Sequence, residues 1–159
     1  MLEFDAEDFE GSLQQPRASF VTLRINAVLR GCMGSLEATV ALASDVTQNA
    51  FKSAFKDPRF PPLTSAEFVL IHIAIAVLTS SEPIEFDSEK ELAQQLRPGV
   101  DGVTLKEGTQ RSTLIPAAWN HFTSSVQFVE QLKIKAGLPV DYWSDTIRFE
   151  RYQAESFEE

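Results

Sequence analysis

β-branched residues alternate without a break near the middle of the chain. The alternating residues are Val69, Ile71, Ile73, Ile75 and Val77, and most of the other residues in the segment 68–78 are apolar too. Alternation with a period of two is typical of a β-strand, and a strand that is apolar on both sides is normally central and covered on both faces. We therefore expect a fold built around a sheet with this segment in its middle.

The segments around this strand predict an α+β fold. Residues 20–25 and 28–30 are rich in strand formers and meet at Asn26-Ala27, which predicts a β-hairpin. Residues 38–55 place apolar side chains at steps of three and four, which predicts a helix. The other expected elements are a helix over 88–96 with a Ser88–Glu91 capping box, strands at 103–105 and 113–115, a helix over 125–136 and a last strand over 147–157. Since helices and strands do not alternate regularly, antiparallel or mixed sheets with packed helices are favoured over a doubly wound sheet.

Size and charge narrow the possible functions. A chain of 159 residues fits a single domain over 1–159, and turn-forming residues mark 82–112 as a smaller subdomain within it. The chain carries 14 Lys and Arg against 23 Asp and Glu, a net charge of −9. Since phosphate affinity comes mainly from Lys and Arg, this balance disfavours a general nucleic-acid-binding protein.

The sequence predicts a cytoplasmic protein with no membrane-spanning segment and no metal site, and it allows no cofactor to be assigned. Its first ten residues are acidic, unlike a secretory leader, and the apolar run 68–78 is shorter than the about 20 residues that cross a bilayer. His72 lies within that run, where a buried core histidine is the simplest interpretation. Neither histidine has metal-ligand spacing, and the single Cys32 excludes an internal disulfide and a multi-cysteine zinc site.

The segment Leu29-Arg30-Gly31-Cys32-Met33-Gly34 concentrates the residues that can carry chemistry. Glycines permit close backbone approach, and Arg30 can stabilise a thiolate or bind an anion. The segment therefore predicts a reactive thiol or an anion-binding turn. The alternative is that Cys32 is a small buried apolar residue.

A second segment, Asp57-Pro58-Arg59-Phe60-Pro61-Pro62-Leu63, is stiffened by prolines. Asp57 and Arg59 can form a structural ion pair with each other. They can instead line a cleft opposite Cys32, where they would contribute to a site.

In their order, these segments resemble the AMMECR family, and the resemblance extends over residues 17–157. Further motifs in the family's order are Pro83-Ile84, Pro98-Gly99-Val100-Asp101-Gly102, Leu114-Ile115-Pro116 and Lys135-Ala136-Gly137-Leu138-Pro139. The resemblance implies an α+β fold of two unequal subdomains, with a site near the Cys32 motif on the face between them. It also implies association with Memo-like and radical-SAM proteins, as in the AmmeMemoRadiSam system, although the family's activity is not established. Lys133 stands where many relatives carry a second cysteine.

Three functional hypotheses follow. The first is an intracellular ligand- or protein-binding module in which the arginines of a cleft receive a small anionic group. That cleft comprises Arg30, Gly31, Cys32, Gly34, Asp57, Arg59 and Phe60. The second is an enzyme that uses Cys32 as a nucleophile or redox thiol, with Arg30 lowering its pKa and Asp57 acting as general acid or base. The third, a nucleic-acid-binding regulator, is opposed by the net charge.

Overall fold

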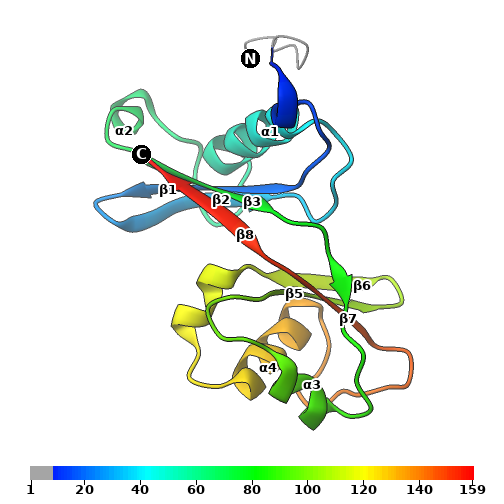
Figure 1. Ribbon diagram of the computed structural model, residues 1–159. Helices are drawn as coiled ribbons and strands as arrows, with labels where there is room; N and C mark the ends of the chain where they lie inside the picture. The colour runs from blue at the N-terminus through cyan, green and yellow to red at the C-terminus, as the bar shows by residue number, and fades with distance from the viewer. Residues whose placement is uncertain (1–8) are drawn as a thin grey trace. The chain divides into compact units, whose positions relative to one another are not determined.

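The computed structural model describes residues 9–159, which fall into two compact units. Unit 1 comprises Met1–Thr79 and Glu155–Glu159, and unit 2 comprises Ser80–Ala154. Unit 2 includes the predicted subdomain 82–112 but runs further along the chain. Each unit holds one four-stranded sheet with helices packed on it (Figure 1), which confirms the α+β class. No helix in residues 9–159 is long and apolar enough to cross a membrane.

The sheet of unit 1 has the strand order β2-β1-β3-β8. The elements of this unit are η2 (Gly11–Leu13), β1 (Ser19–Ile25), β2 (Val28–Gly34), α1 (Leu42–Phe55), α2 (Ser65–Phe68), β3 (His72–Leu78) and β8 (Ala154–Glu158). The predicted β1–β2 hairpin is confirmed. Its two turn residues, Asn26 and Ala27, both have positive φ, at 51° and 65°, as a two-residue turn of type I′ requires.

The strand predicted over 68–78 is shorter than expected because a local cap competes with it. Thr64 Oγ1 accepts a hydrogen bond from the Glu67 N–H, and the Glu67 carboxylate accepts one from the Thr64 N–H. This reciprocal cap stabilises one helical turn, α2, so β3 begins only at His72. β3 is central, as predicted, but most of its side chains are half-buried rather than covered on both faces. His72 is exposed, so its assignment to the core is wrong.

α1 covers one face of this sheet (Figure 1), where Val21 and Leu23 of β1 pack with Ala54. The helix begins at Leu42 rather than at 38, because Ala41 forms a β-bridge with Pro16 and has a non-helical ψ of 141°. One buried carboxylate ties the start of α1 to β1. Asp45 accepts hydrogen bonds from the N–H and the hydroxyl of Ser19 at 2.8 and 2.6 Å.

The sheet of unit 2 has the strand order β4-β7-β5-β6. The elements of this unit are β4 (Glu82–Pro83), α3 (Glu89–Gln95), β5 (Gly102–Glu107), β6 (Gln110–Leu114), η3 (Pro116–His121), α4 (Ser125–Lys135) and β7 (Arg148–Tyr152). Its core includes Trp119 stacked on Phe128, with ring centroids 3.8 Å apart. The strand predicted over 147–157 is two strands, because the chain leaves this sheet after β7 and joins the other as β8.

Ser88 caps α3 as predicted, since its hydroxyl accepts a hydrogen bond from the Glu91 N–H. The Glu91 carboxylate, however, accepts from the Asp87 N–H, one residue before the cap. The second half of the predicted capping box is therefore wrong.

Lys133 of α4 is fully buried in unit 2. Its ammonium group pairs with Glu89 of α3, donates to the carbonyl of Val140 at 3.0 Å and lies 5.6 Å from the ring centroid of Trp143. The Glu89 carboxylate and the Val140 carbonyl together compensate the buried positive charge of Lys133. A buried ion pair nevertheless adds little stability once its desolvation is counted.

We expect Lys133→Met to change the free energy of unfolding by no more than about 1 kcal/mol. Methionine fills a similar volume, and Glu89 is exposed enough to regain water when its partner is lost. Urea denaturation followed by tryptophan fluorescence measures this directly, because both tryptophans, Trp119 and Trp143, lie in unit 2. A loss above about 3 kcal/mol would instead make the lysine a main stabiliser of the unit.

Candidate functional site

A β-bulge sets the direction of Arg30. Leu23 pairs with Gly31 but Arg24 pairs with Leu29, which leaves Arg30 without a partner on β1. The buried Arg30 guanidinium reaches α2 instead, where its Nε and Nη2 atoms lie 2.8 and 3.0 Å from the two carboxylate oxygens of Glu67. This contact with Arg30 is the main reason that the pKa of Glu67 falls to about 2.

Gly31 and Gly34 are required by packing within the chain. A Cβ on Gly31 would lie 2.1 Å from the carbonyl oxygen of Ser53 on α1, and one on Gly34 would lie 2.3 Å from the ring of Phe20. Neither glycine has a positive φ. The close approach that the sequence analysis attributed to a ligand is therefore made by Ser53 at Gly31 and by Phe20 at Gly34.

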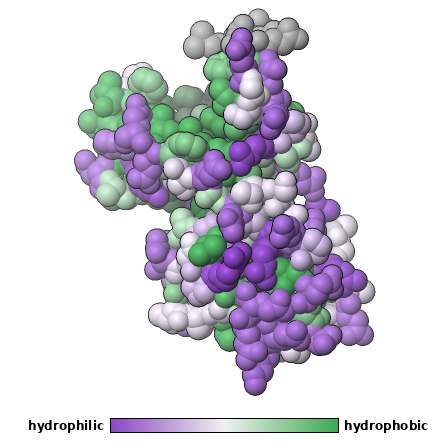
Figure 2. All heavy atoms as spheres, viewed as in Figure 1, coloured by the Kyte–Doolittle hydropathy of each residue, from purple (hydrophilic) through white to green (hydrophobic). Residues whose placement is uncertain are grey.

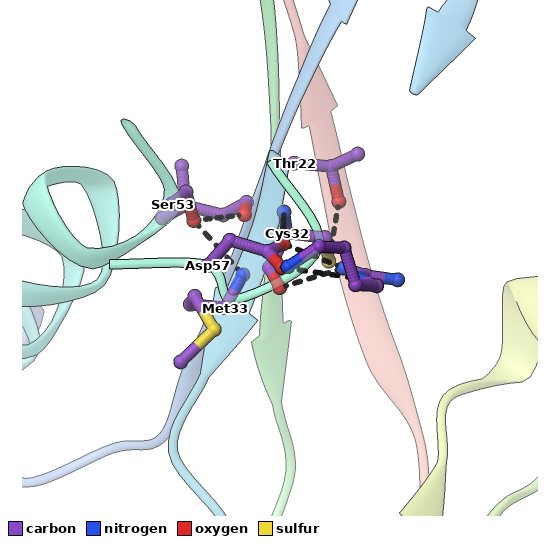
Figure 3. A network of polar contacts seen from close by, with 7 residues as sticks. Thr22, Cys32, Met33, Ser53 and Asp57 are labelled. Atoms are coloured by element: carbon purple, nitrogen blue, oxygen red, sulfur yellow. Dashed lines mark hydrogen bonds and ion pairs between the residues drawn. The ribbon is translucent and has the colours of Figure 1, made fainter. Parts of the chain in front are cut away.

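The hydroxyl of Ser53 is inserted between β1 and β2, close to the bulge. It donates to the carbonyl of Val21 at 2.7 Å and accepts from the Met33 N–H at 2.9 Å (Figure 3). This hydroxyl therefore links β1 and β2 to each other and to α1. The close contact between α1 and Gly31 makes this bridge possible.

Asp57 and Arg59 cover the free edge of β2 at Cys32, and Figure 3 shows Asp57 beside Cys32. Asp57 Oδ2 accepts a hydrogen bond from the Cys32 N–H at 3.0 Å, and Arg59 Nη2 donates to the Cys32 carbonyl at 3.3 Å. The two side chains also form a two-point ion pair, at 2.9 and 2.7 Å. Asp57 and Arg59 therefore pair with each other and face Cys32 at the same time, which combines the two alternatives that the sequence left open.

The ion pair holds Asp57 in its charged form. Hydrogen bonds from Arg59, together with those from the backbone, keep the pKa of the buried Asp57 carboxyl well below its usual range. The same bond raises the pKa of Arg59. An ionised carboxylate that is already saturated with donors is poorly suited to act as a general acid near neutral pH.

Phe60 connects the two ion pairs. The guanidinium carbons of Arg30 and Arg59 lie 5.7 and 5.6 Å from the centroid of its ring. Both distances are within the range of a cation–π contact. The site is therefore a cluster in which each arginine is matched by a carboxylate and packed on an aromatic ring.

Cys32 itself is half-buried, with its Sγ 3.2 Å from Thr22 Oγ1. Thr22 pairs with Cys32 on one side and with Ala74 on the other, so these side chains share the sheet face opposite α1. The Arg30 guanidinium, which the sequence analysis expected beside the thiol, is paired with the Glu67 carboxylate. Arg59 is the arginine that contacts Cys32, through the hydrogen bond from its Nη2 atom to the Cys32 carbonyl.

All seven predicted site residues lie in unit 1. Five of them are linked by direct contacts, namely Arg30, Phe60, Arg59, Asp57 and Cys32, whereas Gly31 packs against Ser53 and Gly34 against Phe20. Sequence reasoning missed Glu67 and Ser53, which complete the cluster. The spacing Thr64-x-x-Glu67 is a capping-box pattern, and it offered a signal for Glu67. Within residues 9–159, no group of three or more His, Cys, Asp and Glu side chains is placed to hold a metal ion.

The sequence analysis also missed an exposed apolar surface next to the cluster. Phe68, Val69 and Leu70, which directly follow Glu67, are 66%, 79% and 55% exposed. Figure 2 shows apolar residues gathered at the upper left, where Figure 1 labels α2. The predicted buried strand had placed these residues in the core.

Comparison with known proteins gives one consistent result. The sequence model of the AMMECR1 family matches residues 2–157. A protein of Methanothermobacter thermautotrophicus is 34% identical over 155 residues, which cover 96% of this chain and 81% of that protein. Protein MJ0810 of Methanocaldococcus jannaschii is 32% identical, with 96% and 78% covered.

A solved structure agrees with these sequence matches. The crystal structure of the uncharacterized protein PH0010 from Pyrococcus horikoshii is similar to this chain with a TM-score of 0.86 and 31% identity, over 93% of this chain and 76% of that one. The Cys32 and Asp57 motifs, the α+β fold and the match over nearly the whole length lead to the same conclusion: this chain belongs to the AMMECR1 family.

Proposed function

We propose that this chain is a cytoplasmic protein-binding module that works with Memo-like and radical-SAM proteins. It binds through the surface next to the Leu29–Gly34 motif, centred on the apolar surface of Phe68, Val69 and Leu70. The exposure of these three consecutive large apolar residues is the observation that carries the proposal. Exposed apolar patches with polar surroundings are typical of interaction sites. The ion-paired cluster of Arg30, Glu67 and Phe60 gives this surface a rigid support.

The geometry favours a protein partner over a small anion. Each arginine of the predicted cleft already has a carboxylate partner, Glu67 for Arg30 and Asp57 for Arg59. An anionic ligand would therefore meet two guanidinium groups whose charge is already balanced by a carboxylate. A partner that buries the apolar surface breaks neither ion pair.

Isothermal titration calorimetry with the Memo-like protein of the same genome tests the proposal. We expect binding to wild type and at least about tenfold weaker binding to Val69→Glu, because the interface would bury an unpaired charge. Because Val69 is 79% exposed, we expect the substitution to leave the fold intact.

The matched control is Val126→Glu, which adds the same charge at an exposed valine of unit 2. It should bind as wild type does. Absence of binding to wild type, or equal loss in both variants, would count against the proposed surface.

A thiol enzyme is the second candidate function, and the partial exposure of Cys32 favours it. In this reading Cys32 is the nucleophile or redox thiol, and Arg59 replaces Arg30 as the neighbouring cation. Rapid alkylation of Cys32 in the folded protein, read by mass spectrometry, supports the enzyme. A thiol that reacts only on unfolding removes it.

A further inference from the structure

Unit 1 contains a second feature, an apolar pocket away from the Cys32 cluster. It lies between α1, the strands β3 and β8, and the segment that leads into β1. Its apolar lining includes Leu13, Leu42, Val46, Ile75, Val77 and Phe157. The pocket has a volume of about 490 Å³, which is within the range of small-molecule sites.

The pocket is lined by one positively charged side chain, that of Arg17. Arg17 is half-buried, and its Nε and Nη2 atoms donate to the carbonyl of Leu78 at 3.3 and 3.2 Å. No carboxylate of the described residues forms an ion pair with it. Arg24, Arg30 and Arg59, the other arginines of unit 1, each have one.

We propose that this pocket binds a free fatty acid of medium chain length. The alkyl chain would lie against Leu42, Val46 and Ile75, and the carboxylate would pair with Arg17. Apolar burial supplies the affinity, and the half-buried guanidinium supplies the preference for an anion. Glu155 also lines the pocket but is exposed, so solvent screens its charge.

A free fatty acid fits better than a membrane lipid. The chain carries a net charge of −9, which opposes approach to an anionic lipid surface. Because a bilayer contains the same kind of alkyl chain, a binding assay with lipid vesicles distinguishes a membrane lipid from a free fatty acid.

The experiment compares three ligands with the same ten-carbon chain by isothermal titration calorimetry on the full chain: decanoate, 1-decanol and decylammonium. We expect decanoate to bind at least about tenfold more tightly than either of the others. Phosphatidylglycerol vesicles should not retain the protein in a sedimentation assay.

Three variants locate the site. Arg17→Gln should remove the preference for decanoate over decanol, whereas Arg17→Lys keeps the charge and should keep most of the preference. Val46→Trp fills the pocket and should abolish binding of both ligands. Arg24→Gln removes a positive charge of the same unit outside the pocket and should bind as wild type does.

Equal affinity for the three ligands, no binding of decanoate, or unchanged binding by Val46→Trp would each overturn the proposal. So would retention on vesicles without binding of free decanoate. The outcome is independent of the Phe68–Leu70 surface, because Val69→Glu should leave decanoate binding unchanged.

Discussion

Gly31→Ala is expected to destabilise unit 1 by about 3 kcal/mol or more. The added Cβ would lie 2.1 Å from the carbonyl oxygen of Ser53, and that oxygen belongs to the backbone of α1. A backbone atom within a packed helix cannot move aside as the end of a side chain can, so α1 must separate from the sheet. The bridge from Ser53 to Val21 and Met33 would then be lost as well.

Amide hydrogen exchange of the β1–β2 hairpin measures this effect. A loss of about 3 kcal/mol corresponds to roughly hundredfold faster exchange of its protected amides. Tryptophan fluorescence is the internal control, since both tryptophans lie in unit 2. Gly34→Ala is the matched variant. It should cost less, because its Cβ meets the half-buried ring of Phe20, which has more freedom to move. Wild-type exchange rates in Gly31→Ala would contradict this account of the motif.

Asp57→Asn is expected to cost about 2–3 kcal/mol of stability at pH 7. The buried carboxylate accepts hydrogen bonds from the Cys32 N–H and from Arg59, and an amide cannot satisfy all of these donors. Arg59 is half-exposed and can turn to solvent, which limits the cost. Urea denaturation followed by circular dichroism measures the difference.

The pH dependence of this difference has a definite sign. Because the folded-state pKa of Asp57 is depressed, its contribution is fully present above the unfolded-state pKa of about 3.9 and is lost as the pH falls towards the folded-state pKa. The stability gap between wild type and Asp57→Asn should therefore be constant from pH 7 to about pH 5 and shrink below about pH 4. Asp145→Asn, which changes an exposed carboxyl, should show no such gap. A gap for Asp57→Asn that persists unchanged at pH 3 would contradict the ion-pair account.

The parts of the fold that could be predicted are those fixed by local pattern. The hairpin turn at Asn26-Ala27 and the cap at Ser88 depend on a few adjacent residues, and both are confirmed. The error at 68–71 arose because the apolar alternation continued across a segment whose start is set by the Thr64–Glu67 cap. The split between β7 and β8 was not predictable, because strand pairing with two different sheets is non-local.

The candidate site shows the same division. Gly31 and Gly34 were identified as important, but they were predicted to make room for a ligand. The sequence does not show that the backbone of Ser53 approaches Gly31. The pair Asp57–Arg59 is local and was foreseen as one of two alternatives. The pair Arg30–Glu67 depends on a β-bulge and a helical turn far apart in sequence, and neither was predicted.

The most direct test of the central claim compares Val69→Glu with Cys32→Ser by calorimetric titration against the Memo-like protein. If the chain is a binding module that uses its apolar surface, Val69→Glu should weaken binding at least about tenfold and Cys32→Ser should stay within about twofold of wild type. The opposite result, with binding lost in Cys32→Ser and retained in Val69→Glu, would contradict the account and place the function at the thiol.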